Sequence, residues 1–194
     1  MRIILASASP RRRELLTQIG IEFEVIVSDV EEHVTATHPH EVVEELSAQK
    51  AYAVLECLQS AEEVLVIGAD TVVSIDGIIL GKPKDDADAA SMLKRLSGRG
   101  HQVYTGVTML YRGADREADV IRKTFSEKTE VEFFEMLPEE IMEYISSGDC
   151  RDKAGSYGIQ GFCARYIAGI SGDYNNVVGL PVARLYQEGK EWLR

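Results

Sequence analysis

The chain of 194 residues carries a formal net charge of −11, with 45% hydrophobic and 27% charged residues. This composition is typical of a globular protein and excludes a disordered chain, and the acidic balance argues against a general nucleic-acid-binding protein. No apolar stretch approaches the ~20 residues that span a bilayer, and the N-terminus lacks the apolar run of a signal peptide. We therefore expect one domain over residues 1–194, in the cytoplasm, with neither a membrane nor a nucleic acid as partner.

Short apolar runs and amphipathic segments alternate in the first part of the chain. Ser9-Pro10 predicts a helix start, because serine favours the N-cap and proline the first helical position. The uninterrupted apolar run 64–69 is typical of a strand that is covered on both faces. In chain order we expect a strand at 3–6, a helix at 11–19, a strand at 23–27, a helix from His40 to about Ser60, and a strand at 64–69.

The second part of the chain opens with a hairpin signal, Asp76-Gly77 between the apolar runs 71–75 and 78–80. Residues 149–181 are rich in glycine and polar side chains and show little periodicity. The other elements expected are helices at 85–96, 138–145 and 182–192, strands at 101–111 and 124–134, and a turn at 112–115. Strands separated by helices predict an α/β fold, with a mixed, twisted sheet flanked by helices.

The cysteines and histidines form no disulfide or zinc pattern. The three cysteines, Cys57, Cys150 and Cys163, are odd in number and widely spaced, which predicts reduced structural thiols. The four histidines lack zinc-binding spacing, and we expect His38 and His40 in an exposed loop. Because the sequence also lacks a nucleophile motif, water activated by a metal ion and a carboxylate is the favoured hydrolytic chemistry.

The segment 7–13, Ser-Ala-Ser-Pro-Arg-Arg-Arg, places three arginines in the first turn of a predicted helix. Positive side chains are unfavourable there, because the helix dipole is positive at this end. The segment is therefore either a solvated basic turn or an anion site. In an anion site, backbone N–H groups, the guanidinium groups and the hydroxyls of Ser7 and Ser9 would converge on one phosphate.

Asp70 closes the apolar run 64–69, and active sites of α/β sheets tend to lie at the carboxyl ends of strands. A carboxylate in this position either accepts backbone N–H groups in a turn or serves as a metal ligand or general base. The acidic segment 28–32 is either solvated or supplies further carboxylates, with Glu31 and Glu32 as candidates. Such a set suits Mg²⁺, which binds one or two carboxylates together with phosphate oxygens and water.

Two later segments carry polar residues suited to a nucleotide. The Gly-Lys-Pro sequence at 81–83 lacks the Ser/Thr and the upstream glycine of a Walker A motif, so Lys82 is either a single phosphate clamp or a surface lysine. Lys50 alone gives a weaker signal. The glycine-rich segment 152–161 is either a flexible connector or a close-fitting loop in which the amide of Gln160 pairs with a base edge.

Four segments, SASPRRRELL, GADTVVSIDGIILGKP, DKAGSYGIQG and GDYNNVVGLP, together resemble the signatures of the Maf family, and AASMLKRLSGRGHQVYTGV fits the same family. The resemblance covers nearly the whole chain. It implies a nucleoside triphosphate pyrophosphatase, a hydrolase of phosphoanhydride bonds that releases the monophosphate and pyrophosphate and needs a divalent cation, Mg²⁺ or Mn²⁺. It also implies an elongated sheet similar to that of inosine triphosphate pyrophosphatases, with two lobes and a central cleft.

The same resemblance implies roles for individual residues. Asp70 matches the family's proton acceptor, and Asp70 and Glu32 are the expected metal ligands, with Glu31 left open as the alternative to Glu32. Thr71, Gln160 and Arg11 match positions linked to substrate choice, and Thr71 and Gln160 follow the pattern of the dTTP/UTP subgroup. The residues expected to bind phosphate are Ser7, Ser9, Arg11, Arg12, Lys50 and Lys82.

The expected reaction is hydrolysis of dTTP and UTP, which would limit non-standard nucleotides; modified pyrimidine nucleotides are further candidate substrates. The alternative is a nucleotide-sensing regulator of cell division without catalysis. A homodimer is expected only by analogy. The segments 149–151 and 175–176 depart from the family pattern, and these departures could alter the fit of the base or the order of the loop.

Overall fold

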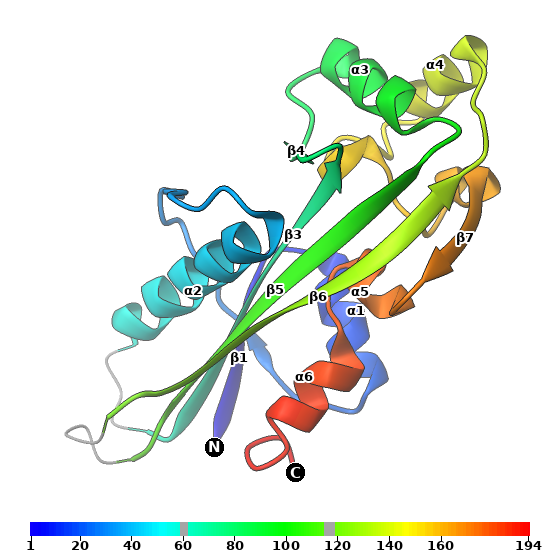
Figure 1. The fold of residues 1–194 in the computed structure, drawn as a ribbon. Helices are drawn as coiled ribbons and strands as arrows, with labels where there is room; N and C mark the ends of the chain where they lie inside the picture. Colours follow the sequence, from blue (N-terminus) through cyan, green and yellow to red (C-terminus); the bar gives the residue numbers. More distant parts are fainter. Residues whose placement is uncertain (59–61, 115–118) are drawn as a thin grey trace. The chain divides into compact units, whose positions relative to one another are not determined.

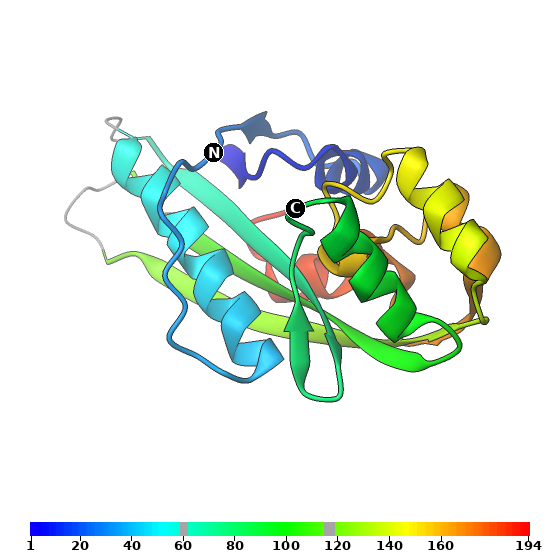
Figure 2. The same cartoon turned by 90° about the horizontal axis from the view of Figure 1, so that it is seen from above.

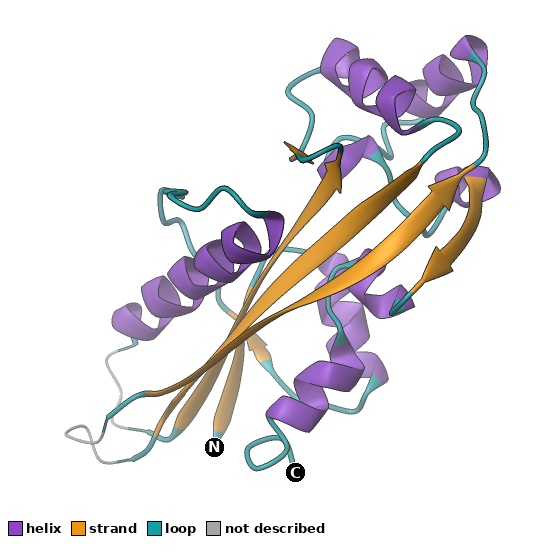
Figure 3. Ribbon diagram, in the orientation of Figure 1, coloured by secondary structure: helices purple, strands orange, loops and turns teal. Residues whose placement is uncertain are grey.

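The structure, a computed structural model, describes residues 1–58, 62–114 and 119–194. Its residues group into two compact units. Unit 1 comprises Met1–Asp70, Thr105–Glu127 and Gly179–Arg194, and unit 2 comprises Thr71–Tyr104 and Lys128–Val178. Three long strands, β3 (Val64–Ile75), β5 (Gly100–Arg112) and β6 (Ile121–Phe133), contribute residues to both units. Figure 3 shows the strands in orange.

The described residues form a sheet of seven strands in the order β2-β1-β3-β5-β6-β7, with β4 paired to β3. The strand β1 (Arg2–Ala6) is parallel to both β2 (Glu24–Val25) and β3. The strands β4 (Ile78–Leu80) and β7 (Ile167–Ser171) are antiparallel to β3 and β6, respectively. The prediction of a mixed sheet flanked by helices is therefore confirmed.

In unit 1, the helix α2 (Pro39–Cys57) covers one face of the sheet, and α1 (Pro10–Gln18) and α6 (Val182–Glu188) lie on the other side (Figures 1 and 2). Apolar side chains of α2 pack against apolar side chains of β1, β3 and β5 and form a core. Its buried members are Ile4, Ala6, Ala51, Val54, Leu55, Val64, Val66 and Leu110. This burial explains why the continuous apolar run of β3 reads as a strand covered on both faces.

Two glycines let α2 approach the strands closely. A Cβ atom at Gly68 would lie 2.3 Å from the carbonyl oxygen of Ser47, and one at Gly106 would lie 2.2 Å from the carbonyl oxygen of Val43. The hydroxyls of Ser47 and Thr108 are 2.9 Å apart in the same contact. These backbone contacts fix the height and rotation of α2 over the strands, and therefore the position of every side chain on its sheet-facing side.

Unit 2 contains α3 (Asp86–Leu96) and α4 (Pro138–Ser146), two short 3₁₀ helices, η1 (Ala154–Ser156) and η2 (Phe162–Tyr166), and α5 (Tyr174–Val178). The helix α3 begins where the sequence favours it, because the Asp85 carboxylate accepts a hydrogen bond of 2.8 Å from the backbone N–H of Asp88. A separate apolar core joins α3 and α4 to the strands, and it includes Leu93, Tyr144 and Ile145.

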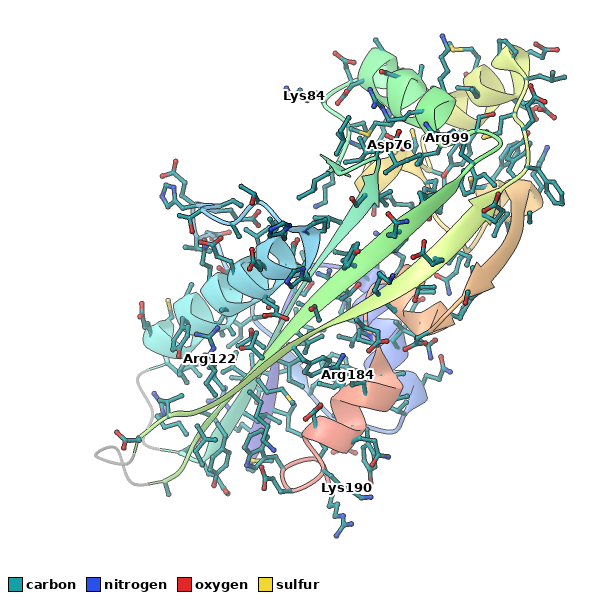
Figure 4. All side chains as sticks on the ribbon, viewed as in Figure 1. Asp76, Lys84, Arg99, Arg122, Arg184 and Lys190 are labelled. Carbon is teal, nitrogen blue, oxygen red and sulfur yellow. The ribbon has the colours of Figure 1, made fainter. Side chains whose placement is uncertain are left out.

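The predicted hairpin between β3 and β4 is confirmed. Asp76 and Gly77 have φ angles of 54° and 75°, and two consecutive positive φ values define the type I′ turn that Asp-Gly favours. The Asp76 carboxylate also accepts two hydrogen bonds, of 2.7 and 2.8 Å, from the guanidinium of Arg99 (Figure 4). The turn is thereby attached to the segment that precedes β5.

Several sequence predictions require correction. Asp70 does not end a strand, because β3 continues through it to Ile75. Residues 149–181 contain an edge strand, β7, and the short helices η1, η2 and α5, none of which the weak periodicity predicted. The remaining differences concern ends: β2 is only Glu24–Val25, α6 ends at Glu188, and His40 lies in the first turn of α2 rather than in a loop, although His38 and His40 are both exposed as predicted.

Two predicted boundaries extend outside the described residues. The helix expected to reach about Ser60 ends at Cys57, and residues 59–61 are not described. The turn expected at 112–115 includes Asp115, which is also not described, whereas Arg112 belongs to β5. All three cysteines are free thiols; Cys150 and Cys163 are buried, as expected of structural thiols, whereas Cys57 is exposed. Among the described residues, no helix combines the length and apolar character needed to cross a membrane.

His101 gives unit 2 a pH-dependent stability. Its side chain is fully buried, its Nε2 lies 2.7 Å from the Tyr157 hydroxyl, and its ring packs edge-on against Phe133. Burial lowers the pKa of His101 to about 4. Since an unfolded histidine has a pKa of about 6.5, the unfolded state binds more protons between these two values. We therefore expect His101 to contribute a fall of about 3 kcal/mol in the free energy of unfolding as the pH falls from about 7 to about 4.

Urea denaturation at several pH values checks this expectation. Comparison with a His101→Gln variant isolates the contribution of the histidine, because the other titrating groups are shared. The variant should be less stable than the wild type near neutral pH. The difference should be smaller near pH 4, close to the pKa of His101 in the folded protein. Parallel pH profiles for the two proteins would contradict the prediction.

Candidate active site

Asp70 and Lys50 meet where α2 crosses β3. Gly68 and Asp70 are two residues apart on β3, so their substituent positions point to the same face of the sheet, toward α2. Ala51 contacts Gly68, which places its neighbour Lys50 beside Asp70. The Lys50 ammonium donates a hydrogen bond to Asp70 Oδ1, and the side chains are only 18% and 15% exposed. The two close glycine contacts of α2 thus position this ion pair.

A second carboxylate reaches the same ammonium. Lys50 Nζ lies 3.0 Å from Glu32 Oε1, so one cation lies between the carboxylates of Glu32 and Asp70. Glu31, the alternative that the sequence left open, lies 4.0 Å from the exposed ring of His33 and is almost fully exposed. The arrangement therefore brings Glu32, rather than Glu31, to Lys50.

The start of α1 holds an arginine in place. Ser7 Oγ accepts hydrogen bonds from Arg12 Nη1 (3.0 Å) and from the backbone N–H of Ser9 (3.3 Å). Arg12 Nε donates to the carbonyl oxygen of Gly179 at 2.8 Å. Ser9 occupies the N-cap position with an extended backbone, but within the described residues its hydroxyl accepts no capping hydrogen bond. The Ser9 hydroxyl therefore does not cap the helix.

The electrostatic surroundings of Arg12 link this turn to the carboxylates. Burial lowers the pKa of the Arg12 guanidinium, the charges of Asp70 and Glu32 raise it, and the charge of Arg11 lowers it. An arginine remains protonated despite such shifts. Unit 1 therefore gathers two guanidinium groups, one ammonium and two carboxylates in one electrostatic neighbourhood, together with the buried hydroxyl of Ser7.

The other predicted site residues belong to unit 2. Thr71 is its first residue and is partly buried, and Lys82 and Gln160 are exposed. The carbonyl oxygen of Gly81 accepts a hydrogen bond of 3.0 Å from the backbone N–H of Gly155. The turn that carries Lys82 is thus joined to the glycine-rich loop that carries Gln160.

That loop is an ordered structure with its own hydrogen-bond network. The hydroxyl of Tyr144 donates to Asp149 Oδ2 at 2.9 Å and accepts from the backbone N–H of Gly158 at 3.3 Å. The ammonium of Lys153 lies 3.0 Å from Asp149 Oδ1 and also donates to the carbonyl oxygen of Asp149. Burial raises the pKa of Tyr144, so its hydroxyl keeps the proton that it donates. Asp149, one of the departures from the family pattern, therefore supports the loop.

The second departure has a structural role. Asn176 is fully buried, and its Nδ2 donates to the carbonyl oxygen of Val103 at 3.1 Å and to Thr129 Oγ1 at 3.0 Å. These bonds attach α5 to the strands of unit 2. Neither this contact nor the Tyr144–Asp149 bond was predictable from the sequence, because both depend on the packing of segments rather than on a local motif.

The carboxylates of Glu32 and Asp70 fit a divalent cation. They converge on a single positive group, and Mg²⁺ is characteristically bound by one or two carboxylates with phosphate oxygens and water as further ligands. The described part of the chain contains no cluster of three or more His, Cys, Asp or Glu side chains that could hold a metal by itself. Two carboxylates would leave the remaining positions around a cation to phosphate oxygens and water.

The comparison with solved structures gives the class of fold first. The structure of the Staphylococcus aureus Ham1 protein matches with a TM-score of 0.51 and 16% sequence identity, over 98% of this chain and 100% of that one. At this identity the likeness concerns the fold alone. It agrees with the prediction of a sheet similar to that of inosine triphosphate pyrophosphatases.

The sequence comparisons then give the family. The model of the Maf family, described as Maf-like protein, matches residues 2–192. A protein of Agathobacter rectalis named dTTP/UTP pyrophosphatase is 56% identical, over 96% of this chain and 95% of its own length. Proteins of the same name from Carboxydothermus hydrogenoformans and Bacillus cytotoxicus are 50% and 51% identical, over 99% and 98% of this chain and 99% and 95% of their own lengths. The chain belongs to the Maf family.

Proposed function

We propose that the protein is a metal-dependent nucleoside triphosphate pyrophosphatase that hydrolyses dTTP and UTP to the monophosphate and pyrophosphate. The observation that carries the proposal is the Glu32–Lys50–Asp70 arrangement beside the arginine-bearing start of α1. Relatives named dTTP/UTP pyrophosphatase, about half identical over nearly the whole chain, support the choice of substrates.

The triphosphate would bind to the cations and hydroxyls of the site. Arg12 is held by Ser7 and Gly179, so its guanidinium is oriented before the substrate binds. A guanidinium can bind two phosphate oxygens at once, and the N-terminus of α1 adds backbone N–H groups. In the proposal, Ser7, Ser9, Arg11, Arg12, Lys50 and Lys82 bind the phosphates.

Asp70 is the proposed proton acceptor for the attacking water. Its carboxylate lies on a strand and is held by Lys50, so it is positioned by rigid elements rather than by a loop. A divalent cation held by Glu32 and Asp70 would neutralise phosphate charge. Lys50, which bridges these two carboxylates, would turn toward the phosphate oxygens when the substrate binds. Positioning and charge neutralisation should supply most of the rate.

The proposed residues for base selection are Thr71, Gln160 and Arg11. Gln160 is exposed on a loop that the Asp149 network orders, and its amide offers both a donor and an acceptor to a pyrimidine edge. We further propose that the chain acts in the cytoplasm, and a homodimer stays an expectation from the family resemblance.

A pyrophosphate-release assay over a panel of nucleotides tests the function. With Mg²⁺ or Mn²⁺ present, we expect dTTP and UTP to be hydrolysed at least ~10-fold more efficiently than purine triphosphates, a discrimination that one or two hydrogen bonds to the base can supply. A chelator should abolish the activity. Binding of dTTP without release of pyrophosphate would contradict the proposal and would favour a nucleotide sensor.

A further inference from the structure

The acidic segment that carries Glu32 is attached to the side of α2 by Gln49. The side-chain amide of Gln49 donates from Nε2 to the carbonyl oxygen of His33 at 2.5 Å, and its Oε1 accepts from the backbone N–H of His33 at 3.0 Å. The amide thus satisfies both backbone polar groups of one residue, as a neighbouring strand would. This residue directly follows Glu32.

Glu45, one helical turn before Gln49, makes a second attachment. Its carboxylate accepts hydrogen bonds from the backbone N–H groups of Thr35 (3.0 Å) and Ala36 (3.1 Å) and from the Thr35 hydroxyl (2.9 Å). These donors lower the pKa of Glu45, so it stays ionised. Residues four apart lie on the same side of a helix, and the two attachments therefore hold the segment 33–36 along one side of α2.

The attachments determine where Glu32 can lie. The side chain of Glu32 is 46% exposed, and its neighbours in the chain, Glu31 and His33, are exposed as well. Little apolar packing therefore holds this part of the chain. The helix α2 holds it instead, with Gln49 fixing the residue next to Glu32 while the adjacent Lys50 binds the Glu32 carboxylate.

We propose that Gln49 and Glu45 are positioning residues that hold Glu32 beside Asp70 and thereby set the affinity of the site for its divalent cation. The inference rests on the proposed function, which assigns the cation to Glu32 and Asp70. Neither Gln49 nor Glu45 is a ligand in this scheme. Residues that orient metal ligands through hydrogen bonds typically change metal affinity by about 10- to 100-fold when they are replaced.

The test measures metal binding directly. The probe is Mn²⁺, and electron paramagnetic resonance of free Mn²⁺ gives its dissociation constant in the presence of a non-hydrolysable triphosphate analogue. We expect Gln49→Ala to raise this constant about tenfold, in the range for such residues. The concentration of Mn²⁺ that gives half-maximal activity should rise in parallel, whereas kcat at saturating Mn²⁺ should stay close to the wild-type value.

Two further variants separate positioning from a general loss of structure. Gln187→Ala replaces an exposed glutamine on α6, another helix of unit 1. This variant should leave Mn²⁺ binding unchanged. Glu45→Gln keeps an acceptor for part of the Thr35 and Ala36 bonds and should have a smaller effect than Glu45→Ala. Thermal unfolding of all variants controls for folding, since the lost bonds lie on an exposed segment and not in the core.

The outcomes distinguish this proposal from the proposed function. Unchanged Mn²⁺ binding in a folded Gln49→Ala variant would overturn the positioning role while leaving the pyrophosphatase proposal intact. Failure of the wild-type protein to bind Mn²⁺ would also overturn the positioning role. Failure of the wild-type protein to release pyrophosphate would instead overturn the proposed function, and the comparison of Mn²⁺ binding would still decide whether Gln49 positions a metal ligand.

Discussion

Replacement of Asp70 by Asn should lower the turnover number for dTTP at least ~10²-fold, within the range expected for loss of a general base. The amide keeps the shape of the side chain but cannot accept the proton of the attacking water, and it removes one of the two negative charges that face Lys50. Release of pyrophosphate at saturating dTTP and Mg²⁺ measures the effect.

An Asp76→Asn variant is the matched control for this prediction. Asp76 comes directly after the last residue of β3. It also pairs with a cation, Arg99, but it lies in the hairpin turn of unit 2. Its pair is exposed, and exposed ion pairs contribute little to stability. We expect near wild-type turnover in this variant. Wild-type turnover in Asp70→Asn would show that Asp70 is not the proton acceptor.

The second large effect concerns stability. Gly106→Ala should destabilise the protein by about 3 kcal/mol or more, at the upper end of the range for overpacked sites. The added Cβ would lie 2.2 Å from the carbonyl oxygen of Val43 and 2.7 Å from the backbone nitrogen of Glu44. Both atoms belong to the backbone of α2, so no change of rotamer can relieve the contact. Urea denaturation, compared at constant m-value, measures the loss.

Gly169→Ala provides the comparison. Gly169 is an exposed residue of β7, and a Cβ there would meet no atom within 4 Å. Exposed substitutions of this kind usually change stability by less than about 0.5 kcal/mol. Similar urea midpoints for the two alanine variants would refute the role that we give to the close contact of α2 with β5.

Short sequence motifs predicted those elements of the fold that depend on neighbouring residues in the chain. The Asp76-Gly77 turn was predictable because few residues adopt two successive positive φ angles. The continuation of β3 past Asp70 was not predicted, because a charged residue after an apolar run is typical of a strand end. Asp70 is the single charged residue of 64–75, and β-branched side chains on both sides of it continue the strand. The edge strand β7 escaped prediction for a different reason. Four of its five residues are exposed, so no alternation of apolar and polar side chains marks it.

The candidate site could be predicted in part for the same physical reasons. The basic start of α1 and the acidic residue Asp70 stand out in the sequence, because each is unfavourable or unusual where it occurs. Lys50, by contrast, gained its interest only from the family resemblance, and its contact with Glu32 depends on the path of a loop. Gln49 gave no signal at all, since a glutamine on a helix is ordinary until its partner, 16 residues earlier, is known.

The boundary between the two compact units falls at the peptide bond that joins Asp70 to Thr71, in the interior of β3. The residue that we propose for chemistry therefore ends one unit, and a residue that we propose for base choice begins the other. Gln160, the second of the three specificity positions, also belongs to unit 2. The third position, Arg11, belongs to unit 1 together with Glu32 and Asp70. Substitutions at Thr71 or Gln160 would therefore change base selection in the unit that does not carry the proposed general base.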